Sequence, residues 1–159
     1  MSDQENGHLR NDREMSARKA SKILREVVNG EDLGPEQVEE ALKVIANRLV
    51  ADSKPISNLK RKPKELGNNR TLILSMIYEG GNNRFDPLSL SLSLMQNGKT
   101  IDRGHLSFDK DPMSTFLDGF FSNGERVGQV QGLRWAAANL LSFRKKGSYV
   151  PLSGPTRRG

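Results

Sequence analysis

The chain has two histidines and no cysteine, and these two facts limit the chemistry that its side chains can perform. His8 stands in a polar N-terminal segment, whereas His105 stands near Asp102, Ser107 and Asp109. A serine–histidine–aspartate triad needs a nucleophile on a sharp turn and an oxyanion hole, and no segment has that pattern. Asp102 and His105 could in principle bind a metal ion, but their spacing matches no known ligand pattern. We therefore predict no catalytic residue, no metal site and no cofactor.

The absence of cysteine also excludes disulfides, thiol nucleophiles and cysteine-ligated zinc, and it fits a reducing compartment. No apolar run approaches the roughly 20 residues that cross a bilayer. Residues 1–13 are polar and mixed in charge, unlike a secretory signal. We expect an intracellular protein, in the cytoplasm or the nucleus, with no membrane span.

Positive charge is the most distinctive chemical property of the chain, whose net charge is +6 and whose isoelectric point is about 9.8. Two segments, residues 53–64 and 134–159, contain basic residues and no acid. Segregated positive charge favours a polyanionic partner, so we predict nucleic acid, RNA before DNA, bound through its phosphates. The residues expected to contact phosphates are Lys60, Arg61, Lys62, Lys64, Arg144, Lys145, Lys146, Arg157 and Arg158.

Both basic segments also have simpler explanations. Residues 60–64 could be a solvated linker or a nuclear import signal. Residues 144–146 could serve only to stabilise the negative end of a helix dipole.

Small residues at helical spacing suggest a second kind of function. Gly128, Gly132 and Ala136 recur every four residues, and Trp135 lies beside them. Such a stripe lets another backbone approach closely, so it could be the interface of a homo-oligomer. Proteins of this kind include matrix-like or coat-like subunits, regulatory proteins and viral accessory proteins. The same stripe could instead pack against helices of its own chain.

Serines alternate with leucines between Leu88 and Leu94, which predicts a strand with a leucine face and a serine face. Hydroxyls on a sheet can contact phosphates or ribose hydroxyls, as binders that recognise RNA by its shape require. A solvated face is the alternative.

The elements that must position these residues follow from periodicity and turn signals. We expect a disordered lead at residues 1–11, a helical hairpin at 12–50 and a basic linker at 51–70. An α+β core should fill residues 71–146, with a flexible basic tail at 147–159. Its fold is expected to be a three-stranded, mainly antiparallel sheet with two C-terminal helices packed on it, a third helix of the chain from Pro112 to Phe121 and a fourth from about Glu125 to Phe143.

The three expected strands begin at Thr71, Leu88 and Lys99, and the last two are joined by a turn at Asn97-Gly98. A regular hairpin would put Arg103 and His105 on the leucine face. A bulge near Gly104 would correct this, because one extra residue changes the face of every residue beyond it.

Overall fold

The computed structural model describes residues 15–79, 87–109, 112–115 and 118–153. These residues form an α+β fold with three helices longer than one turn and a six-stranded antiparallel sheet, in which each strand pairs with the next along the chain. The predicted lead at residues 1–11 lies outside the described residues. The helices are α2 (Ala17–Val28), α3 (Pro35–Leu49), the single turn α4 (Pro112–Thr115) and α5 (Gln129–Leu141). The strands are β1 (Leu59–Gly67), β2 (Arg70–Tyr78), β3 (Pro87–Gln96), β4 (Lys99–Ser107), β5 (Gly119–Ser122) and β6 (Glu125–Val127).

Residues that favour the beginning or the end of a helix lie at the ends of α2 and α3. The Ser16 side chain caps α2 by accepting a hydrogen bond from the Lys19 amide at 3.1 Å. Gly30, with a φ of +94°, follows the end of α2, and Pro35 occupies the first turn of α3. Neither α2 nor any other helix among the described residues is long and apolar enough to cross a membrane.

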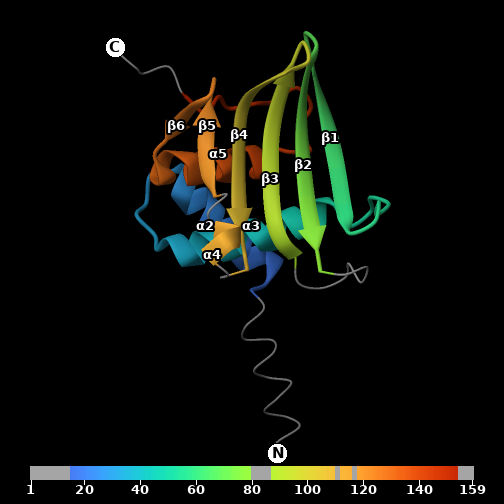
Figure 1. Ribbon diagram of the computed structural model, residues 1–159. Helices are drawn as coiled ribbons and strands as arrows, with labels where there is room; N and C mark the ends of the chain where they lie inside the picture. Colours follow the sequence, from blue (N-terminus) through green and yellow to red (C-terminus); the bar gives the residue numbers. More distant parts are fainter. Residues whose placement is uncertain (1–14, 80–86, 110–111, 116–117, 154–159) are drawn as a thin grey trace, which may run out of the picture.

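Among the described residues, α2, α3 and α5 form a layer over one face of the sheet. α3 contacts β2 and β3, α5 contacts β5, and α2 packs on α3 and α5 (Figure 1). The buried side chains of β2 and β3 alternate with half-buried ones, so each strand turns one face to the helices. We call the face opposite α2, α3 and α5 the open face. At the end of this face near α4, Ser89 and Ser107 are buried.

The β3–β4 hairpin decides which side chains reach the open face. Its turn is Asn97-Gly98, with φ values of 52° and 80°, as a two-residue hairpin turn requires. The register shifts so that Ile101 has no partner on β3. We expected this irregularity near Gly104, and it occurs three residues earlier. Beyond Ile101, Arg103 and His105 lie opposite serines and not opposite leucines.

The predicted three-stranded sheet is wrong, because three further strands form where a linker and helices were expected. β1 occupies the segment that we predicted to be a basic linker, and it pairs with β2 along its length. Its Pro63 is tolerated because β1 is an edge strand. β5 and β6 replace the predicted third helix and the start of the fourth. Phe120 is buried and Phe121 half-buried in β5, because adjacent strand residues point to opposite faces.

Three of the four residues that were predicted to form an interface on the last helix are buried within their own chain. Trp135 is only 2% exposed, and Gly132 and Ala136 are buried. The Trp135 and Phe120 rings meet edge to face, with centroids 6.2 Å apart. A Cβ at Gly132 would stand 2.1 Å from the Phe120 ring, so glycine is what allows α5 to approach β5. Gly128, by contrast, is exposed at the N-terminus of α5.

Hydrogen bonds to the buried carboxylate of Asp102 hold the segment after α5 against the core. Asp102, on the helix-covered face of β4, accepts hydrogen bonds from Ser122 Oγ at 2.6 Å, Tyr149 OH at 2.5 Å and the Leu152 amide at 3.1 Å. Burial, together with the hydrogen bond to Asp102, raises the pKa of Tyr149 well above its usual range. Much of the predicted flexible tail at 147–159 is therefore held in place, up to Ser153.

Candidate nucleic-acid interface

The fold joins the two basic segments that lie far apart in the sequence. Lys64 on β1 donates hydrogen bonds from Nζ to the carbonyl oxygens of Ser142, at 2.9 Å, and Ser148, at 2.7 Å. Ser142 directly follows α5, so the end of α5 lies beside β1, the edge strand of the sheet. We call this region the basic edge and define it as Lys60, Lys62, Lys64, Arg144, Lys145 and Lys146.

Lys64 itself has a structural role that the sequence did not reveal. Its side chain is only 8% exposed, and burial lowers the pKa of its amine. Both of its hydrogen bonds tie β1 to the segment after α5. Burial and the use of two of its three N–H donors inside the protein argue against Lys64 as the predicted phosphate contact.

The other predicted residues of β1 have different environments. Lys62 forms an ion pair with Asp52, whose pKa is lowered by the hydrogen bond from Lys62, at 2.9 Å. Lys60 Nζ lies 5.7 Å from the centre of the Tyr78 ring. Of Lys60, Arg61 and Lys62, only Arg61 is exposed, and it lies on the open face.

The C-terminal basic residues divide into two groups. Arg144, Lys145 and Lys146 are exposed in the turn that follows α5. They remain available to a ligand at the basic edge. Arg157 and Arg158 lie outside the described residues.

The open face carries a row of polar side chains that runs across five strands. Neighbouring positions in this row pair in register, from Arg61 on β1 through Ser75, Ser91 and His105 to Gly119 on β5. Directly opposed residues on one face have neighbouring side chains. The row therefore presents one guanidinium, two hydroxyls and one imidazole on a single surface.

A second row contains two further arginines of the open face. It passes through Ser93, Arg103, Phe121 and Arg126, on β3 to β6. Arg103 and Arg126 lie on either side of Phe121 in the register, and both guanidinium carbons lie near its ring, 4.5 Å and 4.9 Å from the centroid. Both arginines are exposed. Stacking on an aromatic ring restricts a guanidinium while its edge remains free to donate.

A hollow of about 340 Å³ lies between these two rows. Asp118 is the acidic residue of its lining: Oδ1 accepts the Ser107 amide at 2.7 Å and lies 3.5 Å from His105 Nδ1. Two arginines therefore line the hollow against one aspartate. The residues of the lining are Ser91, Ser93, Arg103, Gly104, His105, Asp118, Phe121 and Arg126.

Metal chemistry has no support in the described part of the chain. No group of three or more histidine, aspartate or glutamate residues there could hold a metal ion. Asp102 and His105, which the sequence brought close together, point to opposite faces of β4. Asp102 lies in the core and His105 on the open face, so they share no site.

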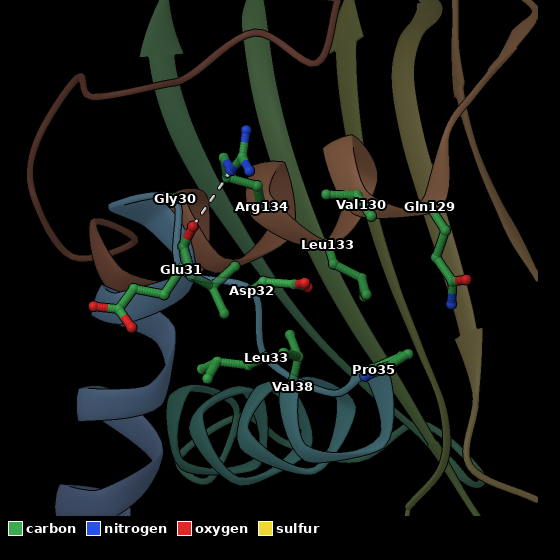
Figure 2. A pocket seen from close by; sticks show the side chains of 11 residues that line it. Gly30, Glu31, Asp32, Leu33, Pro35, Val38, Gln129, Val130, Leu133 and Arg134 are labelled. Atoms are coloured by element: carbon green, nitrogen blue, oxygen red, sulfur yellow. Dashed lines mark hydrogen bonds between the residues drawn. The ribbon is translucent and has the colours of Figure 1, made fainter.

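Another pocket, of about 360 Å³, lies between α5 and the segment that joins α2 to α3. Figure 2 shows Leu133 of α5 across this pocket from Leu33 and Val38. Arg134, at its side, donates a hydrogen bond from Nε to the Val27 carbonyl at 3.3 Å. The lining is mostly apolar and contains none of the predicted phosphate contacts, so we assign it no chemistry.

Sequence reasoning missed Arg103, Phe121 and Arg126 as candidate binding residues. Phe121 and Arg126 were placed on helices, and a helix gives them no common surface. For Arg103 a signal existed, because the conflict between hairpin register and leucine face already required it to move. Together with a correctly predicted strand at residues 119–122, that signal would have placed Arg103 beside Phe121.

Comparison of the chain with protein-family models, curated proteins and solved structures finds no match. Any assignment of function therefore depends on the side chains described above and on their positions.

Proposed function

We propose that this protein binds nucleic acid, RNA in preference to DNA, through the open face and the exposed residues of the basic edge. The observation that carries the proposal is the register of the sheet. It puts Arg61, Arg103 and Arg126 among serine hydroxyls, on a face that none of the described helices longer than one turn covers. Guanidiniums bind phosphate oxygens in a two-pronged geometry, and small hydroxyls can donate to phosphates or to ribose.

The dimensions and composition of the face favour recognition of a backbone over recognition of bases. Six strands at the usual spacing give a surface about 24 Å wide. Phe121, the aromatic residue on the described open face, already lies under two guanidiniums. Base-stacking platforms need uncovered aromatic rings. Binding through phosphates and sugar hydroxyls is the mode that remains.

The helical layer carries charges of both signs, since Arg18, Lys19 and Lys22 are exposed on α2. Glu36, Glu39 and Glu40 lie in the first two turns of α3, and Glu31 and Asp32 precede it. Phosphates approaching this side would meet carboxylates within a few turns of helix. The open face differs from this layer in that Arg103 and Arg126 both lie near one aromatic ring, beside serine hydroxyls.

A salt titration with matched variants tests the proposal. The face variant replaces Arg61, Arg103 and Arg126 by glutamine. The control variant replaces Arg18, Lys19 and Lys22, which are exposed on α2, so the two proteins have the same net charge. Binding to duplex RNA would be followed by fluorescence anisotropy between low and physiological salt.

Each lost phosphate contact should reduce the slope of log K against log salt by about one unit, so we expect the face variant to lose about three. The control should lose less than about one. Equal losses would mean that only net charge matters, and the proposal would fail. It would also fail if the wild type did not bind RNA at low salt.

A second arm compares RNA and DNA duplexes of the same sequence. The serines can reach ribose 2′-hydroxyls only in RNA, so we expect Ser75→Ala, Ser91→Ala and Ser93→Ala together to weaken RNA binding more than DNA binding. Equal effects on the two duplexes would remove the preference for RNA and leave the phosphate contacts intact.

A further inference from the structure

The two arginines beside Phe121 differ from the other cations of the surface in how they are held. Arg103 and Arg126 come from different strands, yet both guanidiniums lie within 5 Å of one ring centre. Arg144, Lys145 and Lys146, by contrast, stand exposed on a turn. A flexible cation loses side-chain entropy when it binds, whereas a stacked guanidinium is already restricted.

Gly119 contributes to this arrangement by having no side chain. A Cβ at Gly119 would stand 2.9 Å from Arg126 Nη1 and 3.0 Å from the Phe121 ring. The absence of that Cβ lets the Arg126 guanidinium lie close over β5. It also places this guanidinium beside the hollow that Arg103, Ser91 and Ser93 line.

We propose that the hollow between Arg103 and Arg126 is a subsite for one phosphate group of the bound nucleic acid. This proposal depends on the proposed function and adds a specific anchoring point to it. Two guanidiniums on one side and two serine hydroxyls on the other can surround several oxygens of a single tetrahedral group. The two positive charges exceed the single negative charge of Asp118, so the hollow favours an anion.

A phosphate subsite makes a prediction that diffuse attraction does not. Lysine keeps the positive charge of arginine but loses the planar fork and the stacking on the ring. Arg103→Lys and Arg126→Lys should therefore weaken binding although the net charge is unchanged. Arg18→Lys is the matched control, because Arg18 is exposed on α2 and lies outside the open face, the basic edge and the hollow.

The probe is a short duplex RNA, prepared once with 5′-hydroxyl and once with 5′-phosphate ends. We expect Arg103→Lys and Arg126→Lys each to raise Kd about tenfold, as for the loss of one charged hydrogen bond, and Arg18→Lys to raise it less than about twofold. If the loss occurs only with the phosphorylated ends, the subsite takes a terminal phosphate. If it occurs with both probes, the subsite takes a phosphate of the backbone.

Thermal melting of each variant would show that the fold is kept. Wild-type affinity in all three lysine variants would overturn the subsite and leave the proposed function standing. Equal losses in all three would also overturn it, because a position outside the binding surface would then matter as much as the hollow. A wild type that binds neither RNA at low salt would overturn the proposed function and the subsite together.

Discussion

Replacing Gly132 by alanine tests how closely α5 packs on the sheet. The new Cβ would stand 2.1 Å from the Phe120 ring, whereas carbon atoms in good contact lie about 3.5–4.0 Å apart. Overpacking a core of this kind costs up to about 3 kcal/mol. Alanine returns about 1 kcal/mol of helix propensity relative to glycine. We therefore expect a net loss of about 2 kcal/mol.

Thermal unfolding followed by circular dichroism would measure this loss. For a chain of this length, about 2 kcal/mol corresponds to a fall in Tm of about 4–8 °C. The matched control is the same substitution in a Phe120→Leu background. Leucine lacks the ring that the Cβ would strike, so Gly132→Ala should there be neutral or stabilising by up to about 1 kcal/mol.

Two results would refute this reasoning. If Gly132→Ala raised Tm in the wild-type background, helix propensity alone would govern the position, and α5 would not press on Phe120. If the substitution instead left Tm unchanged and converted a larger species to monomer in sedimentation, Gly132 would lie at an interface between copies of the chain.

Two further predictions concern buried polar groups. Asp102→Asn replaces one acceptor oxygen of the carboxylate by a donor that faces Tyr149 or its neighbours, so urea denaturation should show that the free energy of unfolding falls by about 3 kcal/mol. Asp52→Asn, at an exposed ion pair, is the control and should cost clearly less. Equal losses in the two variants would contradict the structural role of Asp102. Burial raises the pKa of Tyr78 to about 12 from 10.0, and its hydroxyl donates to Asn47. Because the folded state holds this proton more tightly, the stability that it contributes is complete below pH 10 and is lost as the pH rises through 12. Tyr78→Phe should therefore lose less stability than the wild type between pH 10 and 12 in urea titrations at fixed pH, and an unchanged alkaline loss would exclude Tyr78 as its source.

The candidate site could be predicted from the sequence only in part. The serine face of β3 follows from strict alternation, since strand periodicity is a local property. Arg61 was identified by composition, because it belongs to a run of basic residues. Composition could not separate Arg61 from Lys64, however. One is exposed on the open face and the other is buried, because alternate residues of β1 point to opposite sides of the sheet.

The sequence by itself determined the features that depend on near neighbours. Helices α2 and α3 lie where apolar spacing and Pro35 predicted helices, although α2 begins after Ser16 and not at residue 12, and the Asn97-Gly98 turn joins two strands as expected. In each case the signal is a hydrogen bond or a backbone preference within a few residues.

Only the tertiary structure decided the features that depend on a distant partner. β1 forms from a proline-containing, basic segment because β2 is available to pair with it. Residues 119–122 form a strand, although their apolar spacing also suits a helix, because β4 and β6 lie on either side. Trp135 is buried because β5 brings Phe120 against α5. Strand pairing and core packing join residues far apart in the chain, and local periodicity contains no information about which of them will meet.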